Sequence, residues 1–262
     1  MARTRIRWDG ETVADCLRAH ARGITVEEVA QLTGVPSATV RTWTRGTIPA
    51  AGWRALLGTG SCPRCGGPPH RFGDLAETPY LYVLGTYLGD GVVDERSRST
   101  SLRIACDPQY PGLIAEMVSA IEALRGRKPN VALRRTCRCV VITSYWKCWP
   151  CLLPQHGAGR KHRRPIVLEP WQRDLIAQDP RPLIRGLIQT DGWRGTNRVH
   201  VKGRDYEYPR YQFSNRSDDI RRIFTDACDR LDIAWRPWGR WHVSVARRDS
   251  VARLDEFVGL KA

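Results

Sequence analysis

The feature that most constrains this chain is an internal repeat of an apolar segment that ends in Asp-Gly. The two copies are YLYVLGTYLGDG, residues 80–91, and RPLIRGLIQTDG, residues 181–192. Each copy predicts an apolar helix that stops at its final glycine. Each is followed by the pattern of two short strands, an amphipathic helix, two more strands and a last helix. The repeat therefore predicts two similar halves, residues 80–179 with a polar connector and residues 180–262.

Small residues recur at matching places in the two predicted helices. Alignment of the copies sets Gly85 against Gly186 and Gly89 against Thr190. Residues four apart lie on one face of a helix, and faces made of small residues let two helix backbones approach closely. We therefore expect the two helices to pack against each other at the seam between the halves.

The same alignment pairs Asp90 with Asp191, each at the C-terminal end of its helix. A helix C-terminus carries partial negative charge, so a carboxylate there is unfavourable. Two carboxylates brought together at the seam repel each other further. Cations in the gap would relieve both effects, and carboxylates beside water and phosphate oxygens suit Mg²⁺. Two acids and divalent ions beside a phosphodiester are the parts that metal-assisted hydrolysis needs.

With two such copies 101 residues apart, residues 80–262 resemble the LAGLIDADG homing endonucleases in their single-chain, two-motif form. The resemblance implies an α+β fold of two pseudo-symmetric αββαββα halves that form a DNA-binding saddle. It also implies that Asp90 and Asp191, the last acids of the motifs, bind the catalytic Mg²⁺. Neither copy matches the family motif letter for letter.

Family members also use a basic residue near the end of each half to assist catalysis, and Lys161 and Lys261 occupy matching positions here. The chain has only five lysines, which gives the coincidence weight. The resemblance therefore implies catalytic roles for both side chains. The alternative is that Lys161 belongs to a basic connector and Lys261 to a terminal tail.

Residues 1–50 predict a small all-α module of three short helices. Thr25 and Glu28 form a capping-box pattern before the second helix. Residues 34–36, Gly-Val-Pro, break that helix, and a third helix follows. A helix, a tight turn and a second helix are the signature of a helix-turn-helix module. Arg41 and Arg45 of the third helix are then candidates for contact with the DNA major groove. The alternative is a three-helix bundle used for protein contacts.

Charge and strand patterns favour double-stranded DNA as the partner. The formal net charge is +15 and the isoelectric point is about 9.9, which favours a polyanionic partner over a surface kept basic for solubility. Alternation over residues 198–202 puts three basic side chains on one strand face, before a hairpin turn at residues 202–205. The candidate DNA-contacting residues of the two halves are Arg96, Arg98, Arg103, Arg138, Arg198, His200, Lys202, Arg204 and Arg240. Three tryptophans are expected to pack in the core or in hairpins rather than on bases: Trp235, Trp238 and Trp241.

Residues 51–79 are rich in proline and glycine and predict a linker that carries half of a zinc knuckle. The half-site is Cys62-Pro-Arg-Cys65-Gly, with His70 nearby. A structural zinc site needs four ligands, and the sequence offers two further pairs: Cys148 with Cys151, and Cys137 with Cys139. The alternative is that these cysteines are buried, inert thiols. In a cytosolic chain, thiols or metal ligands are expected rather than disulfides.

The sequence contains no apolar run of membrane-spanning length and no apolar segment near the N-terminus. We therefore expect a cytoplasmic bacterial protein, associated with the nucleoid when bound to DNA, and monomeric because both halves share one chain. The first functional hypothesis is a site-specific endonuclease of homing type that makes a Mg²⁺-dependent double-strand break. The alternative is a transcription regulator that kept the fold and lost cleavage, similar to bacterial sporulation regulators with a helix-turn-helix domain. A DNA-binding remnant of a mobile element is a third possibility.

Overall fold

The computed structural model describes residues 8–45, 47–49, 52, 62, 64–67, 70, 72, 75–96, 99–136, 138–201, 203–259 and 261. Arg98, Cys137 and Lys202 lie outside these described residues. The chain divides into two units, Met1–Arg71 and Phe72–Ala262, and each unit is described by itself.

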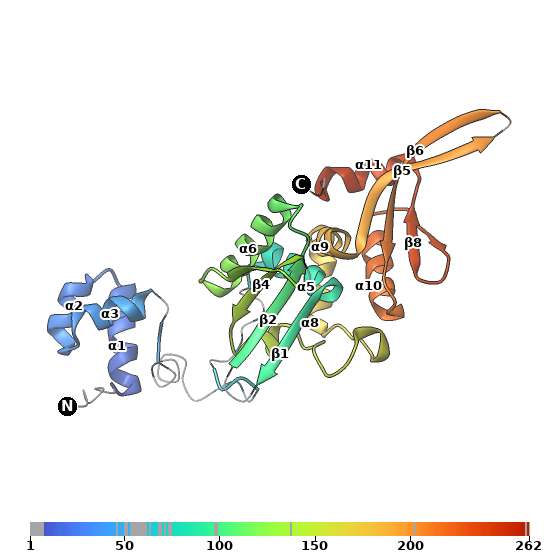
Figure 1. Ribbon diagram of the computed structural model, residues 1–262. Helices are drawn as coiled ribbons and strands as arrows, with labels where there is room; N and C mark the ends of the chain where they lie inside the picture. Colours follow the sequence, from blue (N-terminus) through green and yellow to red (C-terminus); the bar gives the residue numbers. More distant parts are fainter. Residues whose placement is uncertain are drawn as a thin grey trace. The chain divides into compact units, whose positions relative to one another are not determined.

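The first unit contains the three predicted helices: α1 Gly10–Ala21, α2 Val26–Thr33 and α3 Ser37–Thr44 (Figure 1). The capping box of Thr25 and Glu28 is present, and Gly34 ends α2 in the left-handed conformation at φ 70°. The helices enclose a small core of Val13, Cys16, Val29, Val35, Val40 and Trp43. The helical prediction is confirmed, whereas the DNA-binding role of the module stays a prediction.

The second unit opens with one α–β–β–α–β–β half (Figure 1). Its elements are α5 Glu77–Gly89, β1 Gly91–Arg96, β2 Ser99–Cys106, α6 Pro111–Arg125, β3 Asn130–Arg134, β4 Cys139–Tyr145 and α7 Trp149–Leu152. The strands form an antiparallel sheet in the order β1-β2-β4-β3.

The rest of the second unit repeats this topology. Its elements are α9 Arg181–Asp191, β5 Gly192–Val201, β6 Arg204–Ser214, α10 Asp218–Asp229, β7 Arg236–Trp238, β8 His242–Val245 and α11 Arg248–Phe257. The antiparallel order β5-β6-β8-β7 matches that of the first sheet. The predicted α+β fold of two similar halves is confirmed.

Three features differ from the sequence-based expectations. The β5–β6 hairpin is long rather than short, with continuous pairing from Gly192↔Phe213 to Val201↔Arg204, and it extends beyond the rest of its sheet (Figure 1). The supposed polar connector contains the helix α8 Pro170–Gln178, which begins with proline and a capping box. Cys139 is disulfide-bonded, so the expectation that cysteines are thiols or metal ligands is wrong for this residue.

Each sheet has one face packed on helices and an opposite face that we call its outer face. In the first sheet Leu102, Ile104 and Ile142 point into the core with α5 and α6. In the second, Tyr211 and Phe213 point toward α10 and α11. Strand alternation then places the intervening residues on the outer faces. On the first sheet these are Arg96, Ser101, Arg103, Arg134 and Thr143; on the second they are Asn197, Tyr206, Tyr208, Arg210, Gln212 and Trp238.

No described helix is both long enough and apolar enough to cross a membrane.

Candidate active site and nucleic-acid interface

Helices α5 and α9 pack against each other through their small residues. A Cβ added to Gly186 would lie 2.5 Å from the backbone oxygen of Tyr82 and 2.9 Å from the backbone nitrogen of Thr86. Gly89 faces the side chain of Thr190. Gly85 therefore lies opposite Gly186 and Gly89 opposite Thr190, which are the pairings that the alignment of the two copies predicts. Backbones this close leave no room for a larger side chain, so the seam holds the two helix ends in fixed positions.

The two seam helices bring Asp90 and Asp191 into one electrostatic environment. Asp90 directly follows α5 and keeps solvent exposure, and Asp191 is the last residue of α9 and is half-buried. Loss of hydration raises the pKa of the Asp90 carboxyl, while Lys161 and Lys261 oppose the rise. Loss of hydration and the charge of Asp90 raise the pKa of Asp191 to about 6. The site is therefore a pair of interacting carboxyl groups that solvent reaches.

Lys161 lies at the C-terminal end of α5, where its ammonium group donates to three backbone carbonyls. The acceptors are the oxygens of Tyr87, of Leu88 at 3.1 Å and of Gly89 at 2.7 Å. The last carbonyls of a helix lack the donors of a following turn and carry its partial negative charge. The Tyr87 oxygen also accepts from the Asp90 backbone N–H. Burial lowers the pKa of Lys161 to about 8, although both aspartates favour its charged form.

Lys261 occupies the corresponding place in the second half. Its Nζ atom donates to the backbone oxygen of Gly192, directly after α9, at 2.6 Å. Burial lowers its pKa, while Asp90 and Asp191 favour the charged form. The four residues that the sequence proposed as catalytic therefore form one cluster, with a lysine at each helix end.

Sequence analysis missed Asn215, whose side-chain amide donates a hydrogen bond to Asp191 Oδ2 at 2.6 Å. This bond lowers the pKa of Asp191 against the larger effect of burial. In strand register Gly91 pairs with Ile104 and Gly192 with Phe213, so Asn215 corresponds to Cys106, two residues past each paired position. The two halves therefore place different side chains at this position: an amide that donates to Asp191 in one, and a buried thiol that donates to Met117 Sδ in the other.

The equivalence of Cys106 and Asn215 was hidden by the long hairpin. Cys106 follows Asp90 by 16 residues, whereas Asn215 follows Asp191 by 24. An alignment of the two halves that allowed an eight-residue insertion in the β5–β6 hairpin would have paired Asn215 with Cys106.

Two of the basic residues predicted in the first half, Arg96 and Arg103, lie on the outer face of the first sheet, whereas Arg98 is outside the described residues. Arg96 and Arg103 both form ion pairs with Asp94, at 3.0 and 3.1 Å. Arg138 is exposed in the turn between β3 and β4, with a positive φ of 50°. Exposed ion pairs of this kind contribute little to stability, so these side chains are available to an anionic partner.

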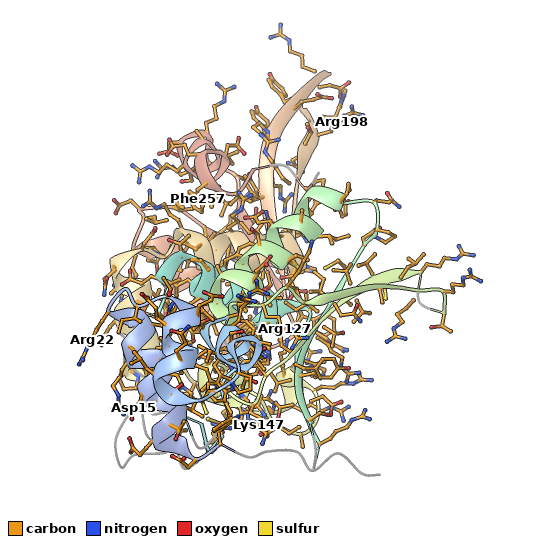
Figure 2. All side chains as sticks on the ribbon, turned by 90° about the vertical axis from the view of Figure 1, so that its left-hand side faces the viewer. Asp15, Arg22, Arg127, Lys147, Arg198 and Phe257 are labelled. Atoms are coloured by element: carbon orange, nitrogen blue, oxygen red, sulfur yellow. The ribbon has the colours of Figure 1, made fainter. Side chains whose placement is uncertain are left out.

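In the second sheet, the predicted basic residues Arg198 and His200 do not lie on the outer face. They lie on the opposite face of the β5–β6 hairpin. Arg198 and His200 pair across the hairpin with Glu207 at 2.6 Å and Asp205 at 2.7 Å, on the side of Tyr211. Figure 2 shows Arg198 toward the far end of this hairpin. Arg204, at the start of β6, and Arg240, in the β7–β8 turn, are also exposed.

The outer face of the second sheet carries aromatic and polar groups that sequence analysis did not select. The Tyr206 and Tyr208 rings are stacked, with centroids 6.2 Å apart. The Arg210 guanidinium lies 4.3 Å from the centroid of the Trp238 ring, and this tryptophan is 49% exposed. Trp238 therefore packs within a hairpin, as expected, but half of its surface faces solvent.

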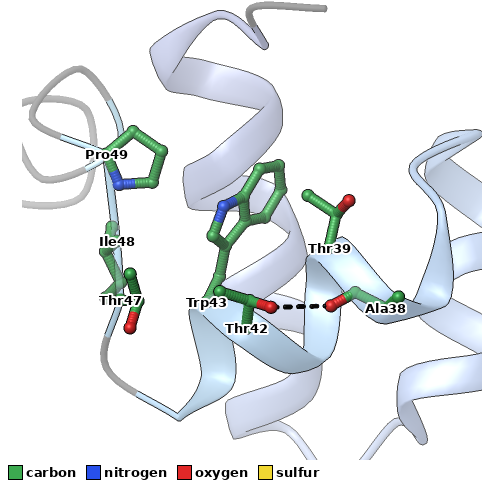
Figure 3. A pocket seen from close by; sticks show the side chains of 7 residues that line it. All are labelled: Ala38, Thr39, Thr42, Trp43, Thr47, Ile48 and Pro49. Carbon is green, nitrogen blue, oxygen red and sulfur yellow. Dashed lines mark hydrogen bonds between the residues drawn. The ribbon is translucent and has the colours of Figure 1, made fainter. Parts of the chain in front are cut away.

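Helix α3 of the first unit presents both predicted arginines to solvent. Arg41 pairs with Glu27 at 2.5 Å, and Arg45 directly follows the helix. The first unit also has an open hollow whose lining includes Thr39, Thr42 and Trp43 of α3 and residues 47–49 (Figure 3). The hollow combines hydroxyl and apolar groups on the face of a short exposed helix.

No protein-family model matches the sequence, and no curated protein matches it. Several solved structures are similar in fold. The N-terminal LAGLIDADG domain of WhiA has 13% identity and a TM-score of 0.45, covering 71% of this chain and 83% of that one. The LAGLIDADG meganuclease I-AabMI bound to uncleaved DNA has 9% identity and a TM-score of 0.45, covering 68% and 82%.

A third similar structure is the K262A mutant of I-SmaMI, with 7% identity and a TM-score of 0.47, covering 69% of this chain and 85% of that one.

Proposed function

We propose that this protein is a LAGLIDADG-type DNA endonuclease that makes a Mg²⁺-dependent double-strand break at a specific site. One observation carries the proposal: two interacting carboxyl groups, Asp90 and Asp191, stand at equivalent helix ends that a glycine seam holds together. Carboxyl groups placed against two helix C-termini and against each other are costly for the fold. Such an arrangement is expected where a function requires it.

The carboxylate oxygens fit a hard divalent cation such as Mg²⁺. When bound, such an ion would activate water and stabilise the leaving oxygen of a phosphodiester. Asp90 and Asp191 would hold the ion, and Asn215 orients Asp191 through its hydrogen bond. Lys161 and Lys261 hold positive charge beside the carboxylates, where negative charge develops on a reacting phosphate.

The outer faces of the two sheets supply the DNA surface in this proposal. Arginines on or near these faces suit phosphate and guanine, and the Tyr206–Tyr208 pair adds exposed aromatic area. The α1–α3 module adds a second DNA contact through Arg41, Arg45 and the hollow on α3. Because both halves share one chain, a monomer suffices, acting at the bacterial nucleoid.

The lysine pair favours a second candidate, a DNA-binding regulator without cleavage activity. Two ammonium groups face two carboxylates, so the cluster is balanced in charge without any metal ion. A cluster that is balanced in charge without a metal ion does not by itself require catalysis.

Cleavage selection distinguishes the two candidates. The full chain is incubated with Mg²⁺ and a randomised double-stranded DNA library beside the Asp90→Asn/Asp191→Asn double variant, and cut ends are sequenced. A matched control is Asp174→Asn, which removes an exposed carboxylate on α8. The nuclease predicts cuts by the wild type and the control and none by the double variant.

Specific binding by all three proteins with no cutting would overturn the nuclease proposal in favour of the regulator. Cutting that survives in the double variant would show that the acids do not carry the chemistry.

A further inference from the structure

A second group of potential ligands lies in the first unit, apart from the carboxylate pair. Cys62, Cys65 and His70 come from the Cys-Pro-Arg-Cys-Gly half-site and the histidine that follows it. The two sulfur atoms and a ring nitrogen of His70 all lie within 4.8 Å of one another. All three residues are partly buried.

The backbone around the two cysteines forms a compact turn. Cys62 N–H donates to the Gly67 oxygen at 2.7 Å, and Gly66 N–H donates to the Cys62 oxygen at 2.9 Å. Gly66 has a positive φ of 63°, which glycine adopts readily. Gly67 N–H points at Cys65 Sγ, 3.4 Å away. The turn therefore holds the backbone of both cysteines and directs a backbone donor at one of the two sulfur atoms.

The spacing of the ligand atoms fits a zinc ion. With Zn–S of about 2.3 Å and Zn–N of about 2.0 Å, tetrahedral geometry separates a sulfur from a ring nitrogen by about 3.5 Å. Cys65 Sγ and His70 Nε2 are 3.3 Å apart. A thiol–imidazole hydrogen bond alone would explain this one distance, but it would not bring the Cys62 sulfur into the same group.

We propose that Cys62, Cys65 and His70 bind a structural zinc ion. The ion cross-links a segment, residues 61–70, whose sequence consists of glycine, proline, cysteine and polar residues and offers no large apolar side chain to a core. Structural zinc sites take a fourth ligand. The sequence offers Cys148 and Cys151 for it, whereas the disulfide of Cys139 removes that residue from the set.

Metal analysis of the reduced full chain tests the proposal. The protein is loaded with Zn²⁺, desalted and analysed for bound metal, and Co²⁺ is substituted so that the thiolate-to-cobalt absorption reports sulfur ligands. The variants are Cys62→Ser, Cys65→Ser and His70→Ala. The controls are Cys16→Ser and Cys228→Ser, which alter cysteines buried in the cores of the two units.

The expected result is one tightly held zinc ion in the wild type and both controls, with at least a tenfold loss of affinity in each ligand variant. The cobalt absorption falls when either cysteine of the half-site is replaced. Cys148→Ser and Cys151→Ser then test the two remaining candidates for the fourth ligand. The cobalt absorption should fall below that of the wild type only when the residue replaced is a ligand.

A wild type that holds no zinc or cobalt after reconstitution overturns the proposal, as does metal binding unchanged in all three ligand variants. Since the measured quantity is bound metal, the result is independent of whether the protein cuts DNA.

Discussion

Gly85 and Gly186 face each other across the α5–α9 seam so closely that a Cβ added to either would lie 3.1 Å from the Cα atom of the other. Helix backbones in this contact leave little freedom for either helix to rotate or slide. The positions of Asp90 and Asp191 follow directly, because each acid lies within six residues of its seam glycine. The close contact between α5 and α9 therefore keeps the two carboxyl groups near each other.

Replacing Gly85 with alanine should destabilise the second unit strongly. The new Cβ would lie 2.5 Å from the backbone oxygen of Leu183, which cannot move without shifting α9. We expect a loss of about 2–3 kcal/mol in the free energy of unfolding, typical of overpacking, measured by urea denaturation. Gly157→Ala is the control, because its Cβ would meet atoms no closer than 3.6 Å. Equal stability of the two variants would contradict a tight seam.

Asp191→Asn should stabilise the metal-free protein above pH 6. The ordinary pKa of 3.8 applies in the unfolded chain, and the folded value is about 6. Between these values the folded state binds the proton more tightly, so wild-type stability falls as pH rises from about 4 to 6. With allowance for solvent screening, the variant should gain about 1–2 kcal/mol at pH 7 and nothing at pH 3.5.

The measurement is chemical denaturation in EDTA at both pH values. Asp174→Asn should be neutral throughout, because its carboxyl is exposed on α8. A variant that is less stable than the wild type at pH 7 would show that the charge of Asp191 supports the fold.

Lys161→Met should weaken both the fold and the site. The substitution leaves the last carbonyls of α5 without their donor and removes the positive charge beside both acids. We expect a loss of about 2 kcal/mol in unfolding free energy, and loss of any Mg²⁺-dependent cleavage. Lys128→Met, at an exposed position, is the matched control. Unchanged stability in a folded Lys161→Met protein would argue against the capping role.

Substitutions on the outer face of the second sheet should reduce DNA affinity more than substitutions on the opposite face of the β5–β6 hairpin. We expect Arg210→Ala and Tyr208→Ala to weaken binding, with the slope of log affinity against log salt reduced by about 1 for the arginine. Arg198→Ala is the comparison, because Arg198 lies on the Tyr211 side of the hairpin. Fluorescence anisotropy with labelled DNA at several salt concentrations measures both quantities. Greater losses at Arg198 would place the DNA on the other face.

Asn215→Ala should shift the pH dependence of cleavage. The Asn215 amide lowers the pKa of Asp191, so its removal should leave more of this carboxyl protonated near neutral pH and unable to bind metal. Cleavage of one strand should slow most at low pH and recover as pH rises. Cys106→Ala, at the equivalent position of the first half, should not produce this shift. A pH-independent loss in Asn215→Ala would mean that the residue acts in another way.

Local sequence was sufficient to predict much of the architecture. The helices of the first unit, the two copies of the α–β–β–α–β–β pattern and the hairpin turn at Gly203 follow from apolar spacing, capping residues and glycine placement. Even the pairing of Gly85 with Gly186 could be predicted, because a repeated sequence predicts a repeated fold and hence a seam. Helix α8 was missed because its buried apolar residues, Leu175 and Ile176, are adjacent and follow a run of polar ones, without the spacing of an apolar helix face.

The sequence by itself determined which side chains stand at the ends of the seam helices, because helix period and glycine stops depend on neighbours along the chain. Only the tertiary structure decided which face of the β5–β6 hairpin lies away from the helices and that Asn215 donates to Asp191. It also decided that the buried thiol of Cys106 takes the equivalent position in the first half, near the charge of Asp90, and that Lys161 reaches the end of α5. These relations join residues 16 to 74 positions apart. They depend on strand register and on the long β5–β6 hairpin, which no local pattern specifies.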